Sequence, residues 1–368
     1  MNPFLLSGYK GPDYFCDRKD ETRRILNAIE NSRNITLVSE RKLGKTALLN
    51  HVSHFIPEQT SFLYIDLYPT QNIEGLIKVL ANAIIQKLEP FNETILRKIT
   101  QFFKALNAKF SFDPQTGLPN LELSVNSKDE MAQSIELLFR YIKQSPVKVT
   151  LAFDEFQQVL NYPEKNMEAV LRTEIQKDSD TCFIFCGSHT RLLLSMFNQY
   201  SRPFYQSTEI MELKPVEQKK YTLFIQEKFS ANGIELSLDE ANFIYELNKG
   251  ITYNIQYLCN KLYASGNKKI DKPCINEMLE QILVENEILY YNYRSLLTTL
   301  HFTILRAIAK EDVVKKPLSQ SFIGKYNLGS ASSVKSAISN LEGKGFLMNN
   351  NGWRVTDWYF SLWLKRQL

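Results

Sequence analysis

The residues best suited to chemistry stand together near the amino terminus, between an apolar run at 35–38 and a predicted helix. They are Ser39, Glu40, Arg41, Lys42, Leu43, Gly44, Lys45 and Thr46. This order of strand, loop and helix is typical of a phosphate-binding loop, in which backbone N–H groups and a helix N-terminus surround a phosphate. We expect Lys45 to reach the β and γ oxygens of ATP, and the Thr46 hydroxyl to hold Mg²⁺.

The loop departs from the pattern G-x-x-x-x-G-K-S/T at its first position, where Ser39 replaces glycine. A small residue there lets the chain leave the strand sharply and keeps the backbone N–H. We therefore expect serine to be tolerated.

Two acidic residues, Asp154 and Glu155, follow a mostly apolar run at 147–153. A strand buried on both faces of a parallel sheet has this composition, and ligands bind near its carboxyl end. We expect Asp154 to hold Mg²⁺ through water. Glu155 would orient or deprotonate the water that attacks the γ-phosphate.

The elements around these residues predict an α/β fold with the parallel sheet of a P-loop NTPase. Strands are expected near 35–38, 61–66, 147–153 and 182–186, and helices near 22–31, 46–55, 73–88, 129–144 and 167–176. Such alternation indicates a parallel sheet. Alternating runs at 109–112 and 121–124 flank turn residues at 113–117 and predict an inserted β-hairpin.

The remaining sequence predicts two further domains. Helices near 216–230, 237–247, 253–264 and 276–285 form a helical lid. Helices near 297–309, 319–325 and 332–344, followed by a hairpin around 349–351, form a winged helix. The expected boundaries are 1–213 for the ATPase domain, 214–288 for the lid and 289–368 for the winged helix.

Basic character is concentrated at the carboxyl end. Residues 296–368 contain ten Lys or Arg and four acids, a net charge of +6, whereas the whole chain carries +4 and the rest therefore −2. A basic terminal domain favours a polyanionic partner such as duplex DNA. The candidate contacts are Lys325, Lys335, Lys344 and Arg354. The alternatives are a solvated basic face and a winged helix that binds protein.

The sequence also gives an expectation for the cellular location of the protein. The amino terminus lacks the long apolar core of a signal peptide, and no apolar stretch of about 18 residues predicts a membrane span. We expect a cytoplasmic protein without a membrane partner.

Several motifs in order along the chain resemble the archaeal-type ATPase family, which belongs to the STAND class of AAA+-like P-loop NTPases. They are Asn2-Pro3-Phe4, Phe15-Cys16-Asp17-Arg18, the loop at 39–46, Asp154-Glu155, Gly187-Ser188, Arg202-Pro203-Phe204-Tyr205, Gly250-Ile251-Thr252-Tyr253 and Val355-Thr356-Asp357-Trp358-Tyr359-Phe360. The resemblance implies an ATPase domain, a helical lid and a C-terminal winged helix.

The resemblance also implies roles for single residues. Phe15 and Arg18 would lie in the adenine-side segment, Ser188 at a polar sensor position and Gly250 in the lid motif that faces the nucleotide. Gln206-Ser207 replaces the family's Gly-Arg, and Thr252 replaces a proline. A missing arginine finger predicts slow hydrolysis unless Arg202 or Arg191 substitutes.

Three functional hypotheses follow. The first is a regulatory ATPase that is switched by ATP and reset by slow hydrolysis. The second is a nucleotide-stabilised DNA-binding regulator without turnover, and the third uses the winged helix for protein contacts or packing. Origin-recognition initiators share the domain order, and the sequence leaves open whether the chain forms a nucleotide-dependent oligomer.

Overall fold

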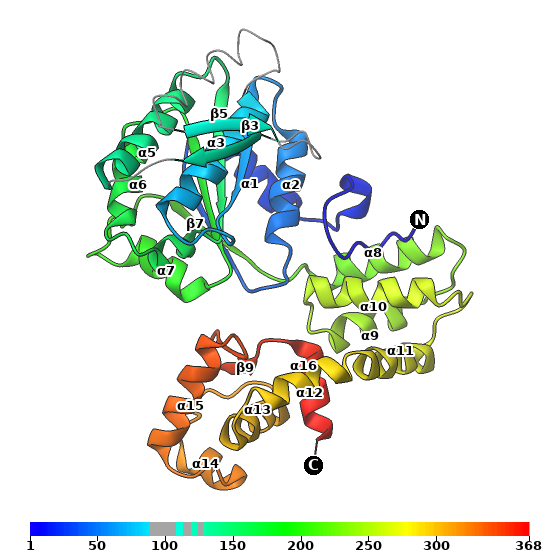
Figure 1. Ribbon diagram of the computed structural model, residues 1–368. Coiled ribbons are helices and arrows are strands. Elements are labelled where there is room, and N and C mark those ends of the chain that lie inside the picture. Colours follow the sequence, from blue (N-terminus) through cyan, green and yellow to red (C-terminus); the bar gives the residue numbers. More distant parts are fainter. Residues whose placement is uncertain (89–107, 113–118, 124–127, 368) are drawn as a thin grey trace. The chain divides into compact units, whose positions relative to one another are not determined.

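The computed structural model describes residues 1–88, 108–112, 119–123 and 128–367 (Figure 1). These residues form two compact units. The α/β unit comprises Leu5–Tyr221 and Ile251–Tyr253, and the C-terminal unit comprises Met1–Phe4, Thr222–Gly250 and Asn254–Leu368. The expected winged helix and most of the expected helical lid fall in the C-terminal unit, whereas residues 214–221 and 251–253 of the expected lid belong to the α/β unit. The expected domain boundaries remain predictions.

A five-stranded sheet forms the centre of the α/β unit, with the order β2-β5-β6-β1-β7. Its strands are β1 (Ile35–Ser39), β2 (Thr60–Asp66), β5 (Lys148–Asp154), β6 (Cys182–Gly187) and β7 (Glu209–Leu213). All neighbouring pairs are parallel, as predicted. Because β1, β6 and β5 are consecutive neighbours, their carboxyl ends meet at one edge of the sheet.

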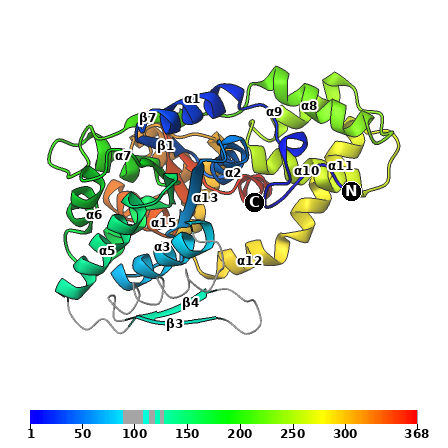
Figure 2. The same ribbon diagram turned by 90° about the horizontal axis from the view of Figure 1, so that it is seen from above.

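Helices cover both faces of this sheet. One core packs α1 (Lys19–Glu30) and α2 (Lys45–Phe55) on the sheet. The other packs α3 (Ile73–Leu88), α5 (Lys128–Lys143), α6 (Met167–Gln176) and α7 (Thr190–Asn198). Figure 2 shows α1 and α2 on one side of β1, and α3 and α5 on the other. Burial on both faces explains why β1, β5 and β6 are nearly continuous apolar runs.

The predicted hairpin is present as β3 (Ala108–Phe112), which pairs antiparallel with β4 (Pro119–Leu123). Its predicted turn at 113–117 lies outside the described residues. Two short 3₁₀ helices, η1 (Pro12–Tyr14) and η2 (Phe156–Asn161), complete the α/β unit as described.

The C-terminal unit is built mainly from helices. They are α8 (Gln218–Ser230), α9 (Leu238–Leu247), α10 (Thr252–Ala264), α11 (Lys272–Glu285), α12 (Glu287–Ser295), α13 (Thr299–Glu311), α14 (Gln320–Tyr326), α15 (Ala331–Gly343) and α16 (Trp358–Arg366). The first residues of α8 and α10 belong to the α/β unit. The wing is the antiparallel pair β8 (Leu347–Asn349) and β9 (Trp353–Val355). Hydroxyl N-caps at Ser319 and Ser330 begin the two helices of the helix-turn-helix.

The sequence patterns do not predict α7, β7, α12 or α16. Strand β7 lies at the edge of the sheet, where exposed Glu209 and Glu212 interrupt the apolar run. Helix α16 is held in place by hydrogen bonds to residues far away in the sequence. The Trp358 indole donates to the Leu247 carbonyl at 2.9 Å, and the Tyr359 hydroxyl donates to Asn248 Oδ1 at 3.1 Å.

Among the helices of the described ranges, none combines the length and apolar character that crossing a bilayer requires.

Candidate nucleotide-binding site

The predicted phosphate-binding loop joins β1 to α2 as expected. Gly44 immediately precedes α2. Its φ of +92° is a left-handed backbone conformation that residues with a side chain rarely adopt. The side chain of Leu43 is buried in the core that packs α1 and α2 on the sheet, and this packing holds the loop in place. The buried Lys45 opens α2, so its ammonium and the helix N-terminus belong to one short segment.

Ser39 occupies the position of the missing glycine without disturbing the strand. It is the last residue of β1 and is buried, and its hydroxyl donates to the Glu40 carbonyl at 2.7 Å. The side chain is therefore satisfied locally and leaves the backbone N–H of the loop unaltered.

The two predicted metal-binding residues come together. Thr46 Oγ1 donates to Asp154 Oδ2 at 3.0 Å, and Asp154 is only 5% exposed. The Tyr64 hydroxyl donates to the same oxygen at 2.7 Å, while Asp154 Oδ1 accepts from the Glu155 N–H at 3.0 Å. A hydroxyl beside a buried carboxylate is an oxygen donor set that suits Mg²⁺.

Tyr64 is a site residue that the sequence did not reveal. It lies on β2, next to β5 in the sheet, and its register partner is Ala152, two residues before Asp154. Burial and the Asp154 charge raise the pKa of its phenol, so the hydroxyl keeps its proton and acts as a donor. Only the strand order, which the sequence does not specify, brings Tyr64 to Asp154.

Glu155 directly follows β5 in a left-handed conformation, with φ +52°. Its Oε2 accepts from the Ser188 hydroxyl at 2.9 Å, from the Ser188 N–H at 3.3 Å and from the Gln157 amide. Burial raises its pKa, but the Gln157 bond, the Lys45 charge and the Ser188 bonds outweigh burial and lower the pKa below its ordinary value. The carboxylate is therefore ionised at neutral pH.

These residues border a cavity of about 440 Å³. Its lining includes Arg41, Lys42, Lys45, Glu155 and Ser188. The cavity brings three cations beside the carboxylate and the sensor-position hydroxyl, an arrangement suited to a triphosphate.

Arg18, predicted on the adenine side, lies under the loop. Its guanidinium is buried, donates to the backbone carbonyls of Lys214 at 2.7 Å and Leu43 at 3.3 Å, and pairs with Glu21 at 2.8 Å. Phe15 stacks on His51 of α2 with ring centroids 4.1 Å apart. Both residues therefore contact the elements that carry the loop, and their contact with adenine remains a prediction.

The start of α10 also contacts the loop. The Tyr253 N–H donates to the Lys42 carbonyl at 3.0 Å, and the Thr252 hydroxyl donates to the Leu43 carbonyl at 3.4 Å. The Lys42 ammonium lies 5.1 Å from the centroid of the Tyr253 ring. Gly250, the predicted contact just before this segment, belongs to the C-terminal unit and donates its N–H to the Tyr245 carbonyl at 3.1 Å. Its role in nucleotide binding stays a prediction.

Arg202 pairs with Glu168 of α6 at 2.5 Å and does not line the cavity at the loop. Arg191 is exposed on α7. The proposed replacement of the family arginine by either residue therefore has no support within the cavity, and it remains a prediction.

The four predicted DNA contacts differ in their surroundings. Lys335 is exposed on α15, and Lys344 is exposed at its carboxyl end. Lys325 pairs with Glu311 at 2.5 Å, and half-buried Arg354 donates to the Asn350 carbonyl at 3.1 Å. Lys335 and Lys344 are thus the better placed of the four to meet a phosphate.

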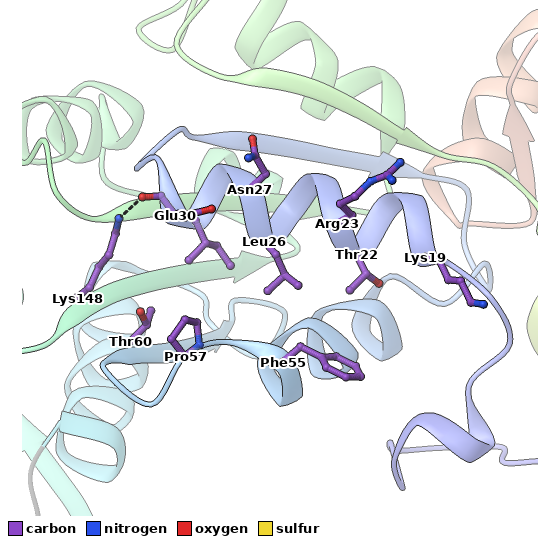
Figure 3. Close-up of a pocket in the computed structure, with 11 residues that line it drawn as sticks. Lys19, Thr22, Arg23, Leu26, Asn27, Glu30, Phe55, Pro57, Thr60 and Lys148 are labelled. Carbon is purple, nitrogen blue, oxygen red and sulfur yellow. Dashed lines mark hydrogen bonds between the residues drawn. The ribbon is translucent and has the colours of Figure 1, made fainter.

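A larger cavity of about 690 Å³ lies elsewhere in the α/β unit (Figure 3). It runs along α1 toward Phe55 and Lys148, and none of the predicted phosphate, metal or base residues lines it. Of its cations, Arg23 pairs with Asp20 at 2.7 Å and Lys148 donates to the Glu30 carbonyl at 2.7 Å. Size therefore does not identify the nucleotide site; the grouping of phosphate, metal and base residues does.

Comparison with known proteins agrees with this geometry. The sequence model of a family described as an ATPase domain predominantly from Archaea matches residues 15–258, more than half of the chain. The chain belongs to this family. A second family, described as a probable winged helix domain, matches residues 288–366. The two matches confirm the predicted family and the predicted C-terminal winged helix of this archaeal-type ATPase.

Solved structures similar to this archaeal-type ATPase include the Walker-type ATPase PABY2304 of Pyrococcus abyssi. It is 20% identical, with 99% of each chain covered and a TM-score of 0.66. ORC2 of Aeropyrum pernix, in ADPNP–ADP complexes, is 12% identical over 99% of this chain and 95% of that one, with a TM-score of 0.60. At these identities the likeness shows the fold alone. No curated protein sequence matches the chain.

Proposed function

We propose that this archaeal-type P-loop ATPase is a slowly hydrolysing regulatory switch of the STAND class, with the winged helix as its effector. The observation that carries the proposal is the meeting of Thr46, Asp154 and Glu155 beside Lys45, at the edge of the sheet where β1 and β5 end on either side of β6. A binding loop alone needs no ionised carboxylate next to its lysine, whereas hydrolysis does.

Each residue then has one task. Backbone N–H groups of residues 40–44 and the Lys45 ammonium would hold the β- and γ-phosphates, and Thr46, with Asp154 acting through water, would hold Mg²⁺. The metal ion would supply charge neutralisation at the phosphoryl oxygens. The water oxygen bonds to the γ-phosphorus and its proton passes to Glu155. The bond from the γ-phosphorus to the bridging oxygen breaks, and ADP leaves with that electron pair.

The contacts at the start of α10 support a switch. Thr252 and Tyr253 bond to carbonyls of Lys42 and Leu43, the residues just before Gly44 and Lys45. A nucleotide that rearranges the loop changes these bonds, and α10 continues from them into the C-terminal unit. The loop would thereby report its occupancy to the helices that follow.

The class alternative is a nucleotide-stabilised DNA-binding regulator that does not turn over. Exposed Lys335 and Lys344 favour a phosphate-led contact with duplex DNA. The serines of α15 suggest weak base selectivity, because Arg and Asn make most bidentate base contacts. A protein partner and a nucleotide-dependent oligomer are further proposals, and the oligomer would let an arginine act on a neighbouring site.

ATP turnover by the wild type beside Glu155→Gln separates the switch from the binder. The amide keeps the shape of the carboxylate but cannot take a proton, so we expect turnover to fall roughly 10²-fold or more while ATP still binds. Phosphate release, with ATP binding measured in parallel, checks this. Equal rates in the two proteins would leave only the binding function.

A further inference from the structure

The amide of Gln157 lies between the catalytic carboxylate and the strand that leads to Ser188. Gln157 is only 6% exposed, lies on η2 and directs its Nε2 to Glu155 Oε2. The hydroxyl and N–H of Ser188 donate to the same oxygen. Three donors from two separate segments thus converge on Oε2.

The other carboxylate oxygen is in a different position. Among the residues that the structure describes, none donates a hydrogen bond to Glu155 Oε1. Rotation of a glutamate carboxylate about its last torsion is broad, so an unrestrained group would sample many orientations. With Oε2 fixed by three donors, Oε1 is the oxygen that remains to accept a proton from water.

Among the described residues, only the nitrogen of the Gln157 amide makes a hydrogen bond. Its Oε1 is buried, and within the described ranges it has no hydrogen-bond partner. A buried polar atom without a partner is destabilising, and an apolar side chain of similar shape would avoid this cost. An apolar residue at position 157 would therefore give a more stable fold than glutamine. This points to the hydrogen bond that the Gln157 amide nitrogen donates to Glu155 as the role of the residue.

Gly187 provides the space for this amide. A Cβ at Gly187 would lie 2.1 Å from Gln157 Oε1, closer than atoms can approach, and would make a tight contact of 3.2 Å with its Cδ. Gly187 ends β6 and is not among the glycines with positive φ. The backbone there does not require glycine, and a side chain at this position would have to displace the Gln157 amide.

We infer that Gln157, accommodated by Gly187, is a positioning residue that orients the Glu155 carboxylate so that Oε1 faces the attacking water. This inference rests on the proposed ATP hydrolysis by Glu155. It adds a second orienting residue to the sensor-position Ser188, and it predicts that both residues act through one carboxylate oxygen.

The first test is Gln157→Met, which keeps the length of the side chain and removes the donor. Loss of a hydrogen bond to a charged group should lower kcat roughly tenfold to a hundredfold, with the Kd of ATP changed less than about twofold. The matched control is Gln199→Met, at an exposed glutamine of the same unit, which should keep the wild-type kcat. Far-ultraviolet circular dichroism and thermal melting confirm that each variant is folded.

A second variant, Gly187→Ala, tests the role of Gly187 without removing any hydrogen-bonding group. Gly187→Ala should displace the amide and lower kcat about as much as Gln157→Ala does. In the double variant the amide is gone, so the added methyl should cost less than about a further twofold.

The inference is overturned if Gln157→Met turns over ATP like the wild type, or if the Gly187→Ala loss adds in full to that of Gln157→Ala. Either outcome would leave the proposed ATP hydrolysis supported, provided that Glu155→Gln shows the expected loss of turnover. If the wild type itself shows no turnover, the proposed function and this inference fail together.

Discussion

At the scale of single residues, local motifs predict the candidate chemical groups, but they do not predict the residues that contact those groups. Lys45, Thr46, Asp154 and Glu155 follow from local motifs, and the structure brings them together. Tyr64 could not be predicted in this way, because its contact with Asp154 spans 90 positions and depends on strand order.

Arg18 illustrates a related limit at the same scale. The resemblance places it in the adenine-side segment, but its guanidinium bonds to backbone carbonyls of Leu43 and Lys214. Backbone acceptors leave no trace in the sequence, so its contact with the loop is visible only in the structure.

The residue-scale prediction concerns Thr46. Thr46→Ala removes the hydroxyl beside Asp154, so we expect the Mg²⁺ concentration for half-maximal turnover to rise roughly tenfold, a usual size for disturbed metal sites. Thr46→Ser keeps the hydroxyl and should behave like the wild type. ATP turnover measured across a titration with Mg²⁺ checks this prediction. An unchanged midpoint in Thr46→Ala would show that Thr46 does not bind the metal.

At the scale of elements, the sequence predicts best where periodicity is strong. Helices α3 and α6 are confirmed with the expected limits, and β1 and β5 with limits within one residue. Strand β7 is missed because only one face of it is buried at the sheet edge. Helix α16 is missed because its dense aromatic residues gave no separate helical signal, although they do form a buried core.

The element-scale prediction concerns α15, the candidate recognition helix. Lys335→Gln should weaken duplex DNA binding and reduce the slope of log Kd against log salt by about one unit, since one phosphate contact releases about one counterion. Lys268→Gln, at an exposed lysine between α10 and α11, is the control and should keep the wild-type slope. A fluorescence anisotropy titration at several salt concentrations measures both.

An unchanged slope in Lys335→Gln would show that α15 does not meet the phosphates. Absence of duplex binding by the wild type at low salt would favour a winged helix that contacts protein. The ion pair of Lys325 with Glu311 already shows that net charge overstates the cations available for DNA.

At the scale of the whole molecule, the domain order could be predicted, whereas the atoms that join the lid motif to the loop could not. Family motifs extend across the chain and imply an ATPase domain, a lid and a winged helix, and they favour a contact around residues 250–253. The individual bonds of Thr252 and Tyr253 to the loop carbonyls do not follow from the motif, because they join residues more than 200 positions apart. Such contacts depend on tertiary folding rather than on local pattern.

The central claim, that ATP binds at residues 39–46, is tested most directly by calorimetric titration of the full chain with ATP and Mg²⁺. We predict one site in the wild type and a Kd raised roughly tenfold to a hundredfold in Lys45→Ala, because a charged contact with the phosphates is lost. Lys19→Ala, which alters a residue lining the larger cavity, should bind ATP like the wild type. Undiminished binding by Lys45→Ala, or weakened binding by Lys19→Ala alone, would contradict the assignment of the loop as the nucleotide site.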